Sequence, residues 1–264
     1  MITRVNSLDL AYDDVGSGLP VVFLHAFPLD RSMWGPQFGA LVGMGRCVAP
    51  DLRGLGATGA SPPYTMDQYA DDVVALLDAI GAASVVVVGL SMGGYIAFAL
   101  WRRHRARVRA LVLADTRAGA DTDEGREKRR RLIAVARSRG SGAVADMQIT
   151  SMVGATTRDR RPDVVETVRA MMAAAPVEGI AGALEAMMTR PDSTSTLATI
   201  DVPTLIVVGD EDELTPPAEA RAMHERIRGS RLEILAGAGH VSNLEQPSAF
   251  NHVVGEFVEG VMLG

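Results

Sequence analysis

Apolar residues follow two alternating patterns along this chain. Strand-like segments fall at 21–24, 47–50, 84–88, 108–113, 204–208 and 232–235; the first is a continuous apolar run, typical of a strand buried on both faces of a parallel sheet. Segments compatible with helices lie between them at 37–44, 66–80 and 92–103. Two short strands at 2–5 and 8–13 precede the series and are expected to be antiparallel. The alternation predicts an α/β fold with a mostly parallel central sheet and helices on both faces.

The alternation stops between residues 115 and 199. This stretch is helical in pattern, is rich in Ala, Met and Arg, and contains no good strand. It lies between two predicted core strands, and chemistry in such sheets collects beyond the carboxyl ends of the strands. We therefore predict a core formed by residues 1–114 and 200–264, with residues 115–199 inserted over that edge as a helical cap.

Charge and cysteine content narrow the choice of partners. The 264 residues carry a net charge of −6, which gives no overall attraction to nucleic acid. The basic run 126–131 is interpreted as a solvated helix face that pairs with Asp121, Asp123 and Glu124. The single cysteine, Cys47, excludes an internal disulfide and a cysteine-based metal site. Because the sequence has no secretory or membrane-spanning apolar stretch, we expect a cytoplasmic protein without nucleic-acid or membrane partners.

A glycine-rich turn carries the strongest chemical signal. The segment Gly89-Leu90-Ser91-Met92-Gly93 fits the pattern Gly-x-Ser-x-Gly and lies between a predicted buried strand and a predicted helix. The flanking glycines allow a sharp turn, which raises the serine hydroxyl above the sheet at a helix N-terminus, where a developing anion is favoured. The alternative is an ordinary glycine-rich turn with a capping serine. We predict that Ser91 is a nucleophile.

A serine nucleophile needs a base, and the base needs an orienting acid. Among five histidines, His240 lies in a glycine-rich loop directly after a predicted strand, which makes it the candidate base. The acid should follow a strand between Ser91 and His240, and the segment 209–213 offers several carboxylates there. The residues alone do not separate Asp210 from Asp212.

These motifs, taken together, resemble the α/β-hydrolase fold enzymes in the chain order Ser, Asp, His. The resemblance covers almost the whole chain and includes the segments 25–28, 51–56, 89–94, 209–212 and 239–240. It implies that Asp212, three positions after Gly209, is the acid. It also implies an oxyanion hole formed by the backbone N–H groups of Phe27 and Met92.

One position departs from the family pattern. Where relatives usually carry glycine before the oxyanion residue, this chain carries Ala26. A positive φ at this position would cost an alanine about 1 kcal/mol and would displace Phe27. The adjacent His25 is interpreted as a structural residue that braces the loop. Substrate-pocket walls are expected at Trp34, Val241 and Met187, with simple packing as the alternative for Trp34 and Met187.

The resemblance is most specific to bacterial carboxylesterases and 3-oxoadipate enol-lactonases. It implies hydrolysis of short- to medium-chain carboxylic esters through an acyl-enzyme intermediate, with a small-molecule ester as substrate and no metal or organic cofactor. The alternatives are enol-lactone or C–C bond hydrolysis by the same triad, or a hydrolase-like binding or signalling protein with a slow triad. We expect a monomer or a small homo-oligomer.

Overall fold

The computed structural model describes residues 1–263 and contains one eight-stranded sheet with the order β1-β2-β4-β3-β5-β6-β7-β8. The strands β1 and β2 pair antiparallel, as do β2 and β4, and all other neighbours are parallel. The predicted mostly parallel sheet is therefore confirmed. The strands are β1 (Ile2–Val5), β2 (Leu8–Val15), β3 (Pro20–Leu24), β4 (Arg46–Pro50), β5 (Val85–Leu90), β6 (Val108–Ala114), β7 (Thr204–Gly209) and β8 (Arg231–Leu235).

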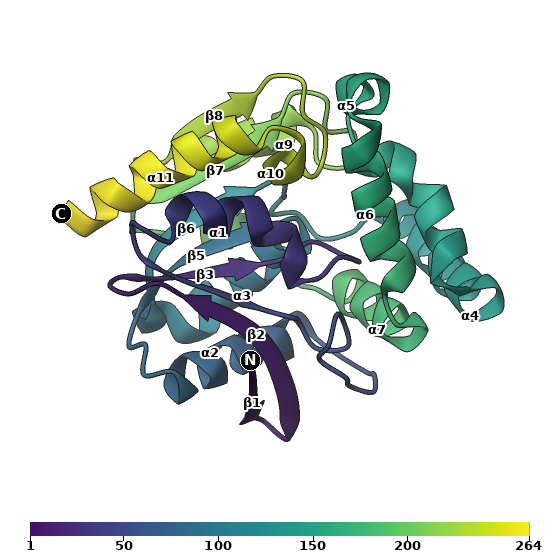
Figure 1. The fold of residues 1–264 in the computed structure, drawn as a ribbon, viewed down its shortest axis with the longest axis horizontal. Helices are drawn as coiled ribbons and strands as arrows, with labels where there is room; N and C mark the ends of the chain where they lie inside the picture. The colour runs from purple at the N-terminus through teal and green to yellow at the C-terminus, as the bar shows by residue number, and fades with distance from the viewer. Residues whose placement is uncertain (264) are drawn as a thin grey trace.

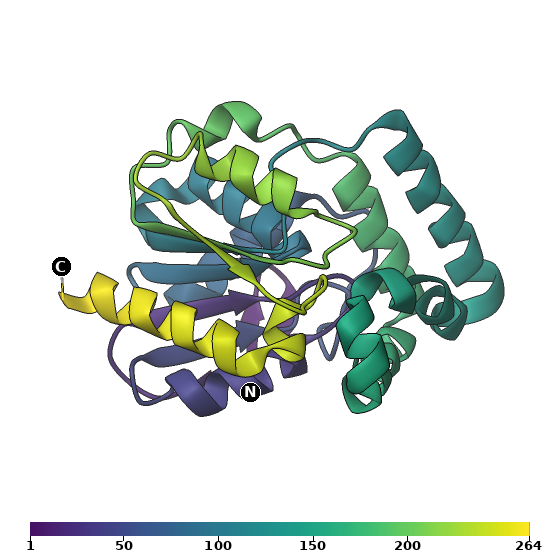
Figure 2. The same ribbon diagram turned by 90° about the horizontal axis from the view of Figure 1, so that it is seen from above.

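Helices cover both faces of this sheet (Figures 1 and 2). Alternate side chains of one strand enter opposite layers: Val87 of β5 packs in the cluster that includes residues of α2, α3 and α9, whereas Val86 and Val88 pack in the cluster that includes residues of α1 and α11. The central strands are buried on both sides, which explains their continuous apolar sequence. The covering helices are α1 (Gly35–Leu41), α2 (Met66–Ala79), α3 (Met92–His104), α9 (Pro217–His224) and α11 (Pro247–Leu263).

A helical region is inserted between β6 and β7, and the two views show it projecting beyond one end of the sheet (Figures 1 and 2). Its long helix α4 packs against α6 and α7 and is interrupted at Gly140, whose φ of 80° breaks the regular backbone. The projecting helices are α4 (Asp123–Met152), α5 (Ala155–Arg160), α6 (Pro162–Ala174) and α7 (Val177–Met188), and the short helix α8 (Thr194–Leu197) follows them beside the far end of α3. No helix formed by residues 1–263 is long and apolar enough to cross a membrane.

Candidate active site

The turn at Ser91 connects β5 to α3 at the centre of the sheet. Ser91 has a φ of 55°, a conformation that costs a residue with a side chain free energy and that is typical of functional sites. A Cβ atom on Gly89 would lie 2.4 Å from the carbonyl oxygen of Gly93, and one on Gly93 would lie 2.1 Å from that of Leu24. Both positions therefore require glycine. The sharp turn predicted from the sequence is present, and it directs Ser91 toward the inserted helices.

Three side chains from distant loops form one hydrogen-bonded chain at this turn. The Nε2 atom of His240 lies 2.7 Å from the Oγ atom of Ser91, and the Nδ1 atom of His240 lies 2.9 Å from the Oδ2 atom of Asp212. Ser91 is 9% exposed, and the other two residues are each 3% exposed. The arrangement has the geometry of a Ser-His-Asp triad.

The surroundings of Asp212 keep it ionised. Burial alone would raise the pKa of Asp212, but hydrogen bonds from His240 and from the backbone and hydroxyl of Thr215 lower it below its ordinary value. The backbone N–H groups of Leu214 and Thr215 donate to Oδ1, and the Thr215 hydroxyl donates to Oδ2. Burial also disfavours the charged form of His240, but Asp212 outweighs it and raises the pKa of the imidazole. The pair is therefore arranged to stabilise an imidazolium.

Two further carboxylates lie near this pair but do not contact the imidazole. Asp210 is exposed and accepts a hydrogen bond from the Gly237 backbone N–H, which orients it away from His240. Asp115 is fully buried behind the triad, where it accepts hydrogen bonds from the Gly209 backbone and the Ser242 hydroxyl. Burial, with Asp212 nearby, raises the pKa of Asp115 well above its ordinary value. Of the two acids left open by the sequence, Asp212 is therefore the one in contact with His240.

Two backbone N–H groups remain available next to Ser91. In the part of the chain that the structure describes, neither Phe27 nor Met92 donates its backbone N–H to another protein group. Such free donors are what an oxyanion requires. Ala26 is not among the described residues with positive φ, so it adopts an ordinary backbone conformation and the strain considered above is absent. Its neighbour His25 is fully buried and accepts a hydrogen bond from the Leu52 backbone N–H, as a bracing residue should.

A cavity of about 350 Å³ opens between this site and the inserted helices. Its walls come from the core loops, from α3, from both halves of α4 and from α7. The lining residues are Phe27, Ser91, Tyr95, Arg117, Asp121, Thr122, Glu124, Gly125, Lys128, Arg129, Leu132, Gln148, Met152, Met187, Glu213, Leu214, Thr215 and His240. The volume suits a small organic substrate. Within residues 1–263, no group of three or more His, Cys, Asp or Glu side chains could hold a metal ion.

The three expected pocket residues occupy different places. Met187 lines the cavity. Trp34 is fully buried, and its ring packs against those of Phe23 and Phe250. Val241 is buried in the same apolar cluster and is not a lining residue. Proximity to a catalytic loop in the sequence is therefore a poor guide to the pocket, because successive side chains of a loop point in different directions.

The sequence predicts that the basic run pairs with Asp121, but not that this pair lies in the wall of the cavity. Arg129, from the run interpreted as a solvated helix face, lines the cavity and donates to the buried carboxylate of Asp121. Arg117 and Arg190 donate to the same carboxylate. Burial opposes ionisation of Asp121, yet the guanidinium groups of Arg129 and Arg190 lower its pKa to about 2. The other cations of the run, exposed or half-exposed, pair with Asp123, Glu124 and Glu127.

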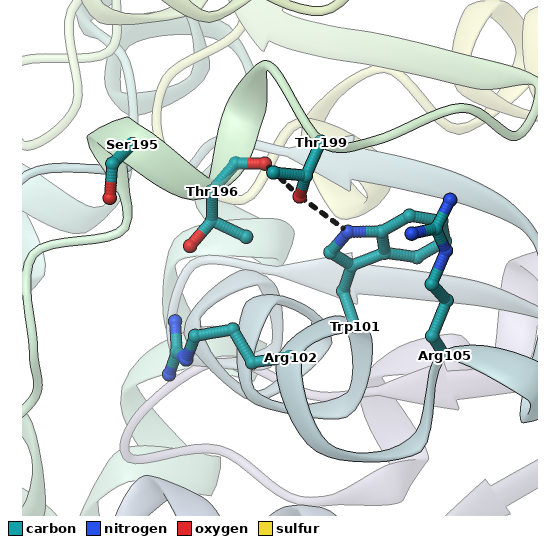
Figure 3. Close-up of a pocket in the computed structure, with 6 residues that line it drawn as sticks. All are labelled: Trp101, Arg102, Arg105, Ser195, Thr196 and Thr199. Carbon is teal, nitrogen blue, oxygen red and sulfur yellow. Dashed lines mark hydrogen bonds between the residues drawn. The ribbon is translucent and has the colours of Figure 1, made fainter.

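A second hollow, of about 380 Å³, lies at the far end of α3 (Figure 3). There the indole N–H of Trp101 donates to the Thr199 hydroxyl, and the guanidinium group of Arg105 lies over the indole ring. Because α3 begins directly after Ser91 and rises about 1.5 Å per residue, this hollow is separated from the triad by most of the length of a helix. It shares no lining residue with the cavity at Ser91.

The chain is similar to known hydrolases in sequence and in fold. The sequence model of the alpha/beta hydrolase fold family matches residues 20–247. An esterase from Thermogutta terrifontis, solved with malate bound, is 38% identical, with a TM-score of 0.95 over 99% of this chain and 98% of that one. The enol-lactonase from Burkholderia xenovorans LB400 is 32% identical, with a TM-score of 0.91 over 98% and 99%. The 3-oxoadipate enol-lactonase 2 of Acinetobacter baylyi is 31% identical over 89% of this chain and 86% of its own length.

Proposed function

Because the chain belongs to the α/β-hydrolase fold family, we propose that it is a carboxylesterase that hydrolyses short- to medium-chain carboxylic esters through Ser91, His240 and Asp212. The observation that carries this proposal is the hydrogen-bonded chain from Asp212 through His240 to the Ser91 hydroxyl, which lies at the wall of a 350 Å³ cavity. The esterase from Thermogutta terrifontis supports the same reaction class.

Acylation follows from the contacts of the triad. His240 accepts the Ser91 proton through Nε2 as the serine oxygen attacks the ester carbonyl. The backbone N–H groups of Phe27 and Met92 stabilise the negative oxygen of the tetrahedral intermediate. The protonated imidazole then donates its proton to the leaving alcohol, and the acyl group remains on Ser91.

Deacylation repeats these steps with water as the nucleophile. The neutral imidazole of His240 removes a proton from water as water attacks the acyl-enzyme carbonyl, and the same donors hold the oxyanion. The proton returns to Ser91 as the acid leaves. Asp212 stays ionised throughout and stabilises the imidazolium in both halves of the cycle.

Enol-lactone hydrolysis is the second candidate. Two relatives at about 30% identity are enol-lactonases, and the chemistry differs only in that the leaving enol oxygen stays tethered to the acyl group. A panel that contains p-nitrophenyl butyrate and a five-membered enol-lactone separates the two candidates. A kcat/KM at least 100-fold higher on the lactone would make lactone hydrolysis the main activity.

The serine assignment is tested with Ser91→Ala. We expect this variant to lose all p-nitrophenyl acetate and butyrate hydrolysis above background while its Tm stays within a few degrees of the native value. The matched control is Ser195→Ala, an exposed serine at the second hollow, which should leave the rate unchanged. Hydrolysis retained by the Ser91 variant would refute the assignment.

A hydrolase-like binding protein is distinguished by active-site labelling. A fluorophosphonate should react with the native protein and add one phosphonyl group to the peptide that contains Ser91, as expected for an activated serine. Folded native protein that neither takes up the probe nor hydrolyses any ester would reject the enzyme proposal altogether.

A further inference from the structure

Arg117 is the cation of the cavity with the most unused hydrogen-bonding capacity. Its side chain is 28% exposed; its Nη2 atom donates to Asp121 at 3.1 Å, and the guanidinium group also lies beside the Tyr95 hydroxyl. The buried Nε atom has no partner. Arg117 therefore presents a partly exposed guanidinium group, with few protein partners, to the same cavity as Ser91.

The other two arginines around Asp121 make more hydrogen bonds than Arg117 does, although the buried Nε atom of Arg190 also has no partner. Arg190 donates to the carbonyl oxygens of Met187 and Gly119 as well as to Asp121. Arg129 also donates to Asp121 and lies 3.3 Å from the sulfur atom of Met187.

Lys128, the remaining cation of the cavity wall, is paired with Glu124 at 2.8 Å. Arg117 is thus the lining arginine with the fewest hydrogen bonds to the protein.

The charge of this cluster is not balanced by the protein. Three guanidinium groups surround the single carboxylate of Asp121, which leaves a formal charge of +2 on the four side chains. The other lining acids are Glu124, paired with Lys128, and Glu213, which is exposed and forms no ion pair with these arginines. An anion in the cavity would supply the missing counter-charge.

A second lining residue also lacks a partner. The buried Oε1 atom of Gln148 has no hydrogen bond, and Gln148 lies on the later half of α4. Polar and charged side chains in one small cavity disfavour a purely alkyl substrate, because those that contact water lose this contact when hydrocarbon displaces it. They favour a polar group on the substrate.

We propose that Arg117 selects esters that carry a free carboxylate a few carbons from the ester carbonyl, such as hemi-esters of short dicarboxylic acids. This inference rests on the proposed function of Ser91. The guanidinium group pairs with the free carboxylate while Ser91 attacks the ester carbonyl, so hydrolysis releases the alcohol and the dicarboxylic acid. Arg117 is a specificity residue and takes no part in proton transfer.

The test compares two substrates with one carbon skeleton, monomethyl glutarate and dimethyl glutarate, by measuring methanol release. We expect the native protein to have a kcat/KM at least tenfold higher on the monoester. Arg117→Gln should lower kcat/KM on the monoester by about 10- to 100-fold, the range for a hydrogen bond to a charged group, and should change the diester rate less than threefold. Arg117→Lys keeps the charge but loses the planar guanidinium group, so its kcat/KM on the monoester should lie between those of the native protein and of Arg117→Gln.

Arg131→Gln is the matched control, because Arg131 is exposed on α4 and pairs only with Glu127. A second measurement is the inhibition of p-nitrophenyl acetate hydrolysis by free glutarate. In the native protein this inhibition should be competitive and should weaken with added salt. In Arg117→Gln the inhibition constant of glutarate should be at least fivefold higher.

Equal loss on both glutarate substrates would show a structural role for Arg117 and would overturn the proposal. A native preference for the diester would also overturn it. If neither substrate is hydrolysed and no phosphonate labels Ser91, the esterase proposal has failed instead.

Discussion

Replacing Asp212 with asparagine tests the orientation of the imidazole, on which the proposed chemistry depends. Oδ1 of Asp212 accepts the backbone N–H groups of Leu214 and Thr215, so the carbonyl oxygen of an asparagine would keep that position. The amide nitrogen would then occupy the place of Oδ2, 2.9 Å from Nδ1 of His240. An N–H donor there forces Nδ1 to be the acceptor and moves the ring proton to Nε2. That proton faces the Ser91 hydroxyl, and the ring can no longer act as a base.

The expected loss is large because two effects combine. The wrong tautomer removes general-base catalysis, and the imidazolium of the transition state loses its ionised partner in a buried site. Together these effects lower kcat by about 10³- to 10⁴-fold, which corresponds to roughly 4–5.5 kcal/mol of transition-state stabilisation. Asp210→Asn should change kcat less than threefold, because an asparagine oxygen can still accept the Gly237 backbone N–H.

The assay is the steady-state hydrolysis of p-nitrophenyl butyrate, with urea unfolding of each variant to show that the fold is intact. The Asp210 variant is the matched control, because it lies on the same loop two residues away. A loss below tenfold in Asp212→Asn, or a larger loss in Asp210→Asn, would refute the assignment of Asp212 as the orienting acid.

Three further predictions concern pH and packing. Because Asp212 raises the pKa of His240 and the base must be neutral, kcat/KM should fall as pH decreases through a value above 6.5, and a midpoint below 6.5 would contradict this. Asp121 has a pKa of about 2, against an ordinary value of 3.8, so its ionised form contributes about 2 kcal/mol to the free energy of unfolding above pH 4. This contribution is lost as the pH falls from 4 through 2. Urea unfolding should therefore show a smaller fall in the free energy of unfolding between pH 4 and pH 2 for Asp121→Asn than for the native protein. Gly93→Ala should lower the Tm by roughly 5–10 °C, because its Cβ would lie 2.1 Å from the Leu24 carbonyl oxygen, whereas Gly142→Ala, with open space at Cβ, should not lower it.

The parts of the site that the sequence predicts are those whose signal is local. The strand, the glycine turn and the helix around Ser91 are contiguous, and each residue type there has a single structural reason. The residues next to Asp210 and Asp212 do not determine which of the two carboxylates contacts His240. It depends on which carboxylate turns toward His240 and which toward Gly237, and the residues of one loop do not encode that by spacing alone.

The cavity wall was predicted least well, because its polar cluster joins residues that are far apart in the sequence. Arg190 and Asp121 are separated by 69 positions and meet only when α7 packs against α4. In the sequence, Arg129 is one of several charges in a basic run, and nothing local marks it as the one that turns inward. For Trp34 the sequence left a pocket wall and simple packing both open, and its ring is buried against that of Phe23.

This difference has a physical origin in how the two halves of the site are built. The triad lies on loops at the ends of strands whose positions are set by the hydrogen bonds of the sheet, so its geometry tolerates little change. The polar wall joins Arg117 and Asp121, on the loop after β6, to Arg129 of α4 and to Arg190 beyond the end of α7, and it does so through side-chain ion pairs and not through the backbone hydrogen bonds of the sheet. Changes at Arg117 should therefore alter which substrate is accepted and leave the hydrogen bond between His240 and Ser91 intact, whereas a change at Gly93 should damage hydrolysis of every substrate alike.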